Sequence, residues 1–342
     1  MEPHSIELPR KILMGKGVSG RMLGLCKELR IMGRPLVLAD SVTKGIAGDR
    51  VFQDLRNLDA RMEIVKEATI QEVARISRRA GPIDAVISVG GGSVIDVGKA
   101  VAFRKQVDFI CVPTAPSHDG IISATASLLH GRKKVSVRGK MPLAIVADTK
   151  ILKSAPKRLI ASGYADAVSN ITAVYDWKLA RKKGEYYSEY AAELGMLAAK
   201  KAMRSANLIK QGSERGVRNL MEALITSSVA MTMAGSSRPA SGAEHAISHV
   251  LDSMGSRALH GEQCGVASIV TACLQGQDWW KIRKALKDGG APTTAKELGV
   301  GRQKFLQAIV KARNYRERYT ILNEKNVDLK KAEKACKDTG VC

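Results

Sequence analysis

Between Pro35 and Thr149 the chain alternates short apolar runs with amphipathic stretches, and this alternation is the strongest constraint on its fold. A short apolar run favours a buried strand, whereas apolar residues spaced three or four apart favour a helix. Strands are predicted at 35–40, 61–65, 84–92 (running into three glycines), 108–114 and 143–149, and helices at 42–57, 70–79 and 93–104. This order predicts an α/β domain with helices on both faces of a parallel sheet.

From about Ile151 onward every apolar pattern has helical spacing, which predicts a second, all-α domain. Helices are predicted at 164–181, 187–209, 216–233, 243–254, 265–274, 279–286 and 302–314. Residues 302–342 alternate both charge signs at helical spacing, and we interpret them as solvated surface helices. The boundary is expected near residues 150–160, which gives domains at 1–155 and 156–342.

The composition is ordinary for a globular protein, with 45% hydrophobic and 26% charged residues, but aromatic residues make up only 4%. The cores are therefore expected to be mostly aliphatic. No apolar run approaches the ~20 residues of a membrane span, and the N-terminus lacks the apolar region of a secretory signal. We expect a cytoplasmic protein without integral membrane contact. The six cysteines form no C-x-x-C pair, which argues against a disulfide framework or a zinc ribbon.

The charge balance is strongly basic, with 55 Lys and Arg against 33 Asp and Glu and a formal net charge of +22. Such a field favours anionic partners, which include nucleic acid, acidic membrane surfaces and phosphorylated small molecules. Nucleic acid is disfavoured because the charges are dispersed and aromatic residues for base stacking are few. Steering of an anion, either an acidic membrane surface or a small phosphorylated molecule, is therefore the interpretation that we favour.

Three consecutive glycines, Gly90 to Gly92, join a predicted strand to a predicted helix. Glycines at this position leave the backbone N–H groups of the helix N-terminus bare, as in a phosphate-binding turn, and Ser93 is placed to cap the helix. A tight turn that merely requires small residues is an equal alternative, because the G-x-G-x-x-G fingerprint is absent. The turn follows the third predicted strand. Lys99, on the following helix, is expected to be solvated.

A second polar loop, residues 112–123, follows the next predicted strand. It contains Thr114, Ser117, Asp119 and Ser123 among prolines and glycine. Open α/β sheets bind their ligands at the carboxyl ends of parallel strands, so we predict a cofactor or substrate role for these four side chains. Asp119-Gly120 is alternatively a simple turn.

Three of the six histidines fall between Ser241 and Gly265. His245 and His249 stack on one helical face, and His260 begins a second apolar run, so the three imidazoles are candidate metal ligands. Each histidine alone is more simply a polar residue of a half-exposed helix. Asp166, on a predicted early helical turn, is the candidate carboxylate, or else a helix cap. Cys264 is interpreted as a buried thiol beside the site.

Taken together, the motifs GGGSVID, PTxxSHDG, GxxDAxxN, EHxxSH and HGExxG resemble those of the sn-glycerol-1-phosphate dehydrogenases. These are the archaeal branch of the iron-containing alcohol dehydrogenase, glycerol dehydrogenase and dehydroquinate synthase superfamily. The resemblance covers nearly the whole chain, and SHDG with the two histidine motifs is its most specific part. It implies a dehydroquinate synthase-like fold: an N-terminal dinucleotide-binding domain, a C-terminal metal- and substrate-binding domain, and a site in the cleft between them.

The resemblance also implies a role for each candidate residue. Asp166, His245 and His260 would hold the metal, while Asp119, Asp166 and His249 would contact the substrate. The cofactor would be held by Gly90, Gly91, Gly92, Ser93 and Val94 at the pyrophosphate, by Thr114, Ala115, Pro116 and Ser117 at the nicotinamide side, and by Ser123. Some iron-dependent relatives carry histidine where this chain has Asn170, and a site with three protein ligands favours zinc over iron.

The implied reaction is the reversible reduction of dihydroxyacetone phosphate to sn-glycerol 1-phosphate with NAD(H) or NADP(H), which supplies the backbone of archaeal phospholipids. Zinc would polarise the carbonyl, His249 would relay the proton, and Asp119 would orient the substrate. Asp40 would disfavour a 2′-phosphate on the coenzyme by repulsion. A homo-oligomer is also implied. The alternatives are a glycerol dehydrogenase, a dehydroquinate synthase (disfavoured because that family has Glu where this chain has Asp166), and a non-catalytic basic binding protein.

Overall fold

The structure, a computed structural model, describes residues 6–131, 133–315 and 317–342. Its internal contacts divide the chain into two units. The α/β unit contains Glu7–Pro116 and Gly120–Pro156, and the helical unit contains chiefly Ser117–Asp119 and Lys157–Cys342. The tripeptide Ser117–Asp119 therefore belongs to the helical unit, although the residues on either side of it belong to the α/β unit.

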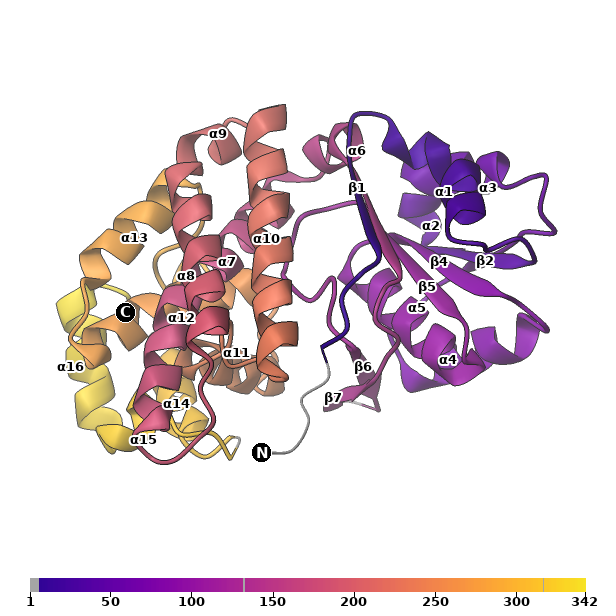
Figure 1. The fold of residues 1–342 in the computed structure, drawn as a ribbon. Coiled ribbons are helices and arrows are strands. Elements are labelled where there is room, and N and C mark those ends of the chain that lie inside the picture. Colours follow the sequence, from indigo (N-terminus) through magenta and orange to yellow (C-terminus); the bar gives the residue numbers. More distant parts are fainter. Residues whose placement is uncertain (1–5, 132, 316) are drawn as a thin grey trace. The chain divides into compact units, whose positions relative to one another are not determined.

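The α/β unit is built on a six-stranded sheet in the order β1-β8-β5-β4-β2-β3, in which every pair of neighbours is parallel (Figure 1). Its strands are β1 (Lys11–Gly15), β2 (Pro35–Ala39), β3 (Arg61–Ile64), β4 (Ala85–Gly90), β5 (Asp108–Pro113) and β8 (Ala144–Asp148). The predicted parallel α/β architecture is confirmed. Strand β1 was not predicted, so the glycine turn follows the fourth strand in the chain and not the third.

Both faces of this sheet are buried, as the continuous apolar sequence of β4 and β5 requires. Alternate residues, among them Ile87 and Val89, join a core with α1 (Met22–Glu28) and α3 (Asp49–Asp54). On the other face lies α5 (Gly92–Lys105), where Gly98 approaches Ser88 so closely that a Cβ would overlap the serine hydroxyl.

The predicted helix at 42–57 is wrong in detail, because this stretch forms three short pieces. These are α2 (Ser41–Thr43), the π-helical turn η2 (Lys44–Gly48) and α3. Helix α4 (Ile70–Arg79) has the predicted bounds, and the remaining elements of the unit are η1 (Val18–Arg21), α6 (Thr149–Lys153) and an antiparallel hairpin of β6 (Thr125–His130) and β7 (Lys133–Arg138).

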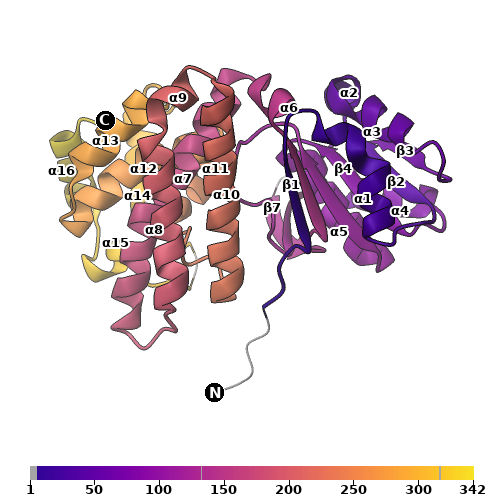
Figure 2. The ribbon, with the colours of Figure 1, turned by 45° about the horizontal axis from the view of Figure 1, so that its top comes forward.

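The helical unit confirms the predicted all-α C-terminal region (Figure 2). Its helices are α7 (Lys157–Arg181), α8 (Glu189–Arg204), α9 (Ala206–Lys210), α10 (Glu214–Ala234), α11 (Ala243–Ser253), α12 (His260–Gln275), α13 (Trp279–Asp288), α14 (Arg302–Ala312), α15 (Ile321–Glu324) and α16 (Leu329–Thr339). Helix α7 is buried along most of its length and packs against α8, α10, α11 and α12. Within the described ranges, no helix is both long and apolar enough to cross a membrane.

The last forty residues form surface helices as predicted, but each has an apolar face that is buried. Phe305, Leu306 and Ile309 of α14 are fully buried, and α14 packs against α11 and α16. The charges that dominate the sequence pattern cover only the outer face. This segment therefore supports the helix that carries two of the three clustered histidines.

Candidate functional site

Three helices of the helical unit bring together a group of metal-binding side chains. Asp166 comes from α7, His245 from α11, and His260 is the first residue of α12. Asp166 Oδ1 lies 3.6 Å from His245 Nε2 and 3.9 Å from His260 Nε2. With Cys264 Sγ, one ligand atom from each residue lies within 4.8 Å of the others.

Among the described residues, one oxygen of this group lacks the hydrogen bond that a buried polar atom normally has. Asp166 is 1% exposed, and its Oδ2 accepts a hydrogen bond of 3.0 Å from the backbone N–H of Asp119. Its Oδ1 has no hydrogen-bond partner among the described residues. Burial and, to a smaller extent, the neighbouring Asp119 raise the pKa of Asp166 to about 7. A bound cation would stabilise this carboxylate, and the oxygen and imidazole donors match those of zinc sites.

Glu244, which the sequence reasoning missed, orients His245. The carboxylate is fully buried, and its Oε1 lies 3.0 Å from His245 Nδ1. The same carboxylate accepts hydrogen bonds from Thr172 Oγ1 and the N–H of Gly242. Burial would raise the pKa of Glu244, but the hydrogen bonds from His245 and Gly242 hold it below its ordinary value. We therefore assign the proton to Nδ1 of His245, which leaves Nε2 as the donor to a metal.

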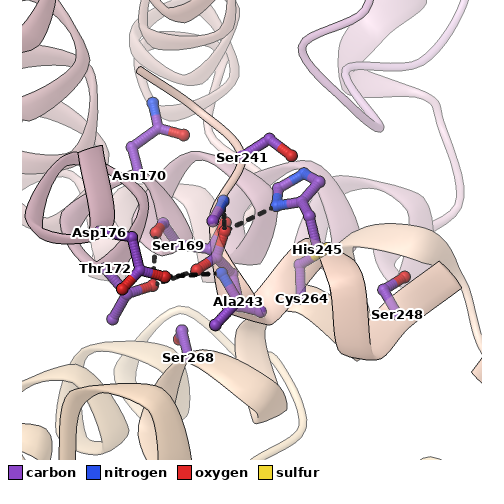
Figure 3. Close-up of polar contacts among 12 residues, drawn as sticks. Ser169, Asn170, Thr172, Asp176, Ser241, Ala243, His245, Ser248, Cys264 and Ser268 are labelled. Atoms are coloured by element: carbon purple, nitrogen blue, oxygen red, sulfur yellow. Dashed lines mark hydrogen bonds and ion pairs between the residues drawn. The ribbon is translucent and has the colours of Figure 1, made fainter. Parts of the chain in front are cut away.

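Asp176 fixes the helices behind Glu244 (Figure 3). Its Oδ2 accepts a 2.7 Å hydrogen bond from Ala243 N, and its Oδ1 accepts hydrogen bonds of 2.9 Å from Gln275 Nε2 and Ile321 N. One buried carboxylate on α7 thus ties α11, α12 and α15 together. Burial and the neighbouring Glu244 raise the pKa of Asp176 to about 7.

His260 is oriented by a second chain of hydrogen bonds. Its Nδ1 lies 3.1 Å from Ser248 Oγ, which donates its own proton to Gln263 Oε1 at 2.7 Å. Because that hydroxyl proton is committed, Nδ1 of His260 is the donor and Nε2 faces Asp166 unprotonated. Gly261 allows the start of α12 to lie close to α7, since a Cβ at this position would overlap the backbone carbonyl of Ser162 on α7.

Cys264 lies one turn after His260, with its Sγ 3.7 Å from His260 Nε2. The sequence pattern placed this thiol beside the site, and the structure places its sulfur within the group of ligand atoms. Burial raises the pKa of Cys264 to about 11. Without a metal it is therefore a neutral thiol.

Asp119 is held against the helical unit by a serine pair that the sequence reasoning also missed. Ser227 Oγ donates a 2.6 Å hydrogen bond to Asp119 Oδ2, and Ser228 Oγ donates to the Asp119 carbonyl. Asn170 Nδ2 donates to Ser227 Oγ at 2.8 Å. Asn170 thus supports the carboxylate of Asp119 through Ser227. The pair stands beside Thr226 in a helix that also carries charged residues, so it gave no signal in the sequence.

His249 is outside the group of ligand atoms but adjacent to it. Its ring centroid lies 5.8 Å from that of His260, and on its other side it stacks on Tyr315 at 5.7 Å with an interplanar angle of 14°. It is half-buried and lines a pocket beside α11. Tyr315 follows α14 and carried no signal in the sequence.

The predicted cofactor-binding residues of the α/β unit lie at the carboxyl ends of β2, β4 and β5. A Cβ on Gly90 would overlap the Val94 side chain, whereas one on Gly91 would meet no atom within 4 Å. Gly91 is the N-cap of α5 and Ser93 its second residue, so the prediction that Ser93 caps the helix is wrong. Thr114 N donates to Gly90 O at 3.0 Å, which joins the two predicted loops.

The side chain of Asp40 caps the N-terminus of α2. Its Oδ1 accepts hydrogen bonds from Val42 N at 2.9 Å and Thr43 N at 2.7 Å, and Thr43 Oγ1 completes a capping box. The carboxylate that was predicted to lie near the adenosine ribose is therefore held in a fixed orientation just after β2.

Lys99 is buried, and the prediction that it is solvated is wrong. It is 0% exposed, and its Nζ lies 3.2 Å from both Ser123 Oγ and Thr125 O and 3.5 Å from Asp96 Oδ1, with Gly120 O as a further acceptor. The β6–β7 hairpin covers this face of α5, which the sequence pattern of α5 alone does not reveal. Lys99 thereby fixes the position of Ser123.

Comparison with known proteins agrees with this arrangement. Residues 13–156 match the family model for iron-containing alcohol dehydrogenase. The chain is 47% identical to glycerol-1-phosphate dehydrogenase [NAD(P)+] from Pyrococcus furiosus, over 99% of both chains, and 44% identical to that from Methanothermobacter thermautotrophicus, over 100% of both. Among solved structures, glycerol dehydrogenase from Schizosaccharomyces pombe is similar, with a TM-score of 0.83 at 20% identity, covering 99% of this chain and 91% of the other. The last similarity concerns the fold alone, whereas the first two establish that the chain belongs to the glycerol-1-phosphate dehydrogenase family.

Proposed function

We propose that the protein is a zinc-dependent oxidoreductase that reversibly reduces dihydroxyacetone phosphate to sn-glycerol 1-phosphate with NADH or NADPH. The observation that carries the proposal is the convergence of Asp166 Oδ1, His245 Nε2 and His260 Nε2 in a chain of this family. The product is the glycerol phosphate backbone of archaeal membrane phospholipids. The net charge of +22 suits a phosphorylated substrate.

Asp166, His245 and His260 are the proposed metal ligands. A zinc ion bound there supplies Lewis-acid polarisation of the substrate carbonyl. Glu244 and Ser248 fix the two imidazole tautomers, so that both Nε2 atoms face Asp166 as donors. Cys264 Sγ adjoins the same point, and as a neutral, buried thiol it is proposed to form a wall of the site and not a ligand.

Asp119 and His249 are the proposed substrate-binding and catalytic residues, and Asp166 also faces the substrate. Ser227 holds the Asp119 carboxylate, which would accept hydrogen bonds from the substrate hydroxyl and orient it. His249, stacked on Tyr315 and next to His260, would deliver the proton to the oxygen on C2.

The α/β unit is the proposed dinucleotide-binding domain, and the helical unit the metal- and substrate-binding domain. The bare N-terminus of α5 at Gly90–Val94 would bind the pyrophosphate. Thr114, Ala115, Pro116 and Ser117 would line the nicotinamide, which supplies the hydride. Ser123, fixed by Lys99, would contact the cofactor, and Asp40 the adenosine ribose. We further propose a cytoplasmic homo-oligomer.

The test is oxidation of NADH and of NADPH with dihydroxyacetone phosphate as substrate, with and without a chelator. We expect turnover that the chelator abolishes and added zinc restores, with sn-glycerol 1-phosphate as the only enantiomer formed. The alternative is glycerol dehydrogenase activity. Faster oxidation of glycerol than of glycerol 1-phosphate would establish that alternative and exclude the proposal.

A further inference from the structure

A small pocket with both apolar and polar walls lies beside the candidate metal group, within the helical unit. It is lined by Ser241, Gly242, Ala246, His249, Ala312, Arg318 and Thr320. Gly242, Ala246 and His249 recur along one side of α11, and the alanines leave room because their side chains are small. Among the residues that line this pocket, Arg318 has the only permanent charge.

Arg318 is held in place by neutral acceptors. Its Nη1 donates to the Ser241 carbonyl and its Nη2 to Ser237 Oγ, both at 3.0 Å. These bonds orient the guanidinium plane. A guanidinium has five N–H groups in a planar fork, a geometry that suits phosphate oxygens.

The backbone around Arg318 is also fixed. Arg238, which is 2% exposed, donates to the Tyr319 carbonyl at 2.9 Å and pairs with Glu185. Thr320 begins α15 with a capping box to Asn323. The backbone that directly follows Arg318 is therefore fixed by contacts within the helical unit, which helps to hold the guanidinium in place.

His249 connects this pocket to the candidate metal group. One side of its ring faces His260, at 5.8 Å between centroids, and the same residue lines the pocket. In dihydroxyacetone phosphate the phosphate sits on the carbon next to the carbonyl, so the two must bind at adjacent places. A substrate with its carbonyl at Asp166, His245 and His260 has its phosphate within reach of this pocket.

We propose that this pocket binds the phosphate of the substrate and that Arg318 is its cation. This inference rests on the proposed function and adds the residue that selects a phosphorylated triose over an unphosphorylated one. Neither the charge count nor the family motifs in the sequence identify such a residue. An uncharged polyol lacks the group that Arg318 binds, so Arg318 contributes to specificity and not to the chemistry at C2.

The experiment compares Arg318→Ala and Arg318→Lys with the wild type on two substrates, dihydroxyacetone phosphate and dihydroxyacetone. Loss of a charge-assisted contact is expected to raise the KM for dihydroxyacetone phosphate about 10- to 100-fold in Arg318→Ala and less in Arg318→Lys. The kcat/KM for dihydroxyacetone and the zinc content should stay within about twofold of wild type. Arg313→Ala is the matched control, because Arg313 lies on the same segment, bonds to Asn326 and does not line the pocket.

An unchanged KM for dihydroxyacetone phosphate in Arg318→Ala overturns the inference. An equal loss on both substrates also overturns it, because a merely structural role has that effect. If the wild type does not reduce dihydroxyacetone phosphate at all, the proposed function fails, and calorimetry with inorganic phosphate then decides on the pocket. Phosphate binding that Arg318→Ala weakens about tenfold supports an anion site there, and binding that Arg318→Ala leaves unchanged excludes it.

Discussion

Lys99 in the α/β unit and Asp166 in the helical unit are both charged side chains that are almost completely buried, but the two units treat them in opposite ways. In the α/β unit, Lys99 Nζ is surrounded by oxygen atoms of Asp96, Gly120, Ser123 and Thr125. In the helical unit, Asp166 Oδ1 faces two imidazole nitrogens and, in the part of the chain that the structure describes, accepts no hydrogen bond.

The difference separates a structural charge from a functional one. Moving a charge out of water costs several kcal/mol, and hydrogen bonds or an opposite charge must offset that cost. The protein itself offsets the burial of Lys99. At Asp166 the protein supplies donor atoms and leaves the compensating charge to a ligand. Burial alone therefore does not identify a site, whereas a buried oxygen that has no hydrogen-bond partner and faces other metal-binding atoms does.

The strongest test of the comparison removes one imidazole from the group. His245→Ala should lower zinc affinity and turnover by more than about 100-fold, since removing a ligand costs at least as much as removing its supporting partner. His249→Ala is the matched control and should retain zinc while losing activity. Metal content after dialysis and steady-state rates report the two effects, and zinc retention by His245→Ala would refute the ligand assignment.

Removing the charge of Lys99, which has hydrogen-bond partners within the protein, should lower the stability of the fold and leave metal binding unchanged. Lys99→Met leaves Asp96 and three further oxygens without their cation, so we expect a loss of about 3–5 kcal/mol in the free energy of unfolding. Urea unfolding measures this loss, and Arg104→Met, at an exposed position of α5, is the control. Zinc affinity should not change. A stability within about 0.5 kcal/mol of wild type would contradict the structural role of Lys99.

Glu244 combines features of Lys99 and Asp166. Its buried charge has hydrogen-bond partners, as that of Lys99 has, but it also acts on the candidate metal site through His245. Glu244→Ala should weaken zinc binding about 10- to 100-fold by releasing the imidazole tautomer. Glu244→Gln keeps an acceptor for His245 Nδ1 and should retain most of the affinity. Competition with a chromophoric chelator measures both, and equal affinities for the Ala variant and wild type would show that Glu244 does not orient His245.

The sequence predicted the parallel sheet and the helical region because strand alternation and helical periodicity are local signals. Strand β1 was missed because it is a five-residue edge strand whose residues are mostly half-exposed and whose apolar run, Ile12 to Met14, is short. The helix at 42–57 was predicted as continuous because its apolar spacing does not reveal the π-turn at Lys44–Gly48. These errors concern short segments whose structure is decided by packing.

At the site, the sequence could propose Asp166, His245 and His260 because their residue types are those of metal ligands. It could not show which atoms lack hydrogen bonds, since that depends on helices distant in the sequence. Glu244 illustrates the limit: it precedes His245 directly, and only the fold shows that its carboxylate reaches the imidazole. Arg318 and the serine pair at 227–228 were invisible for the same reason.

The three proposed ligands lie on α7, α11 and α12, which are separate segments of the chain. Their donor atoms come close together only when these helices pack. The unfolded chain has no such set of donors close together, so a metal binds the folded chain far better than the unfolded one. Its binding free energy therefore adds to the stability of the native state. An ion held by these three residues would therefore also link three helices, and removing the metal should lower the stability of the fold together with the activity.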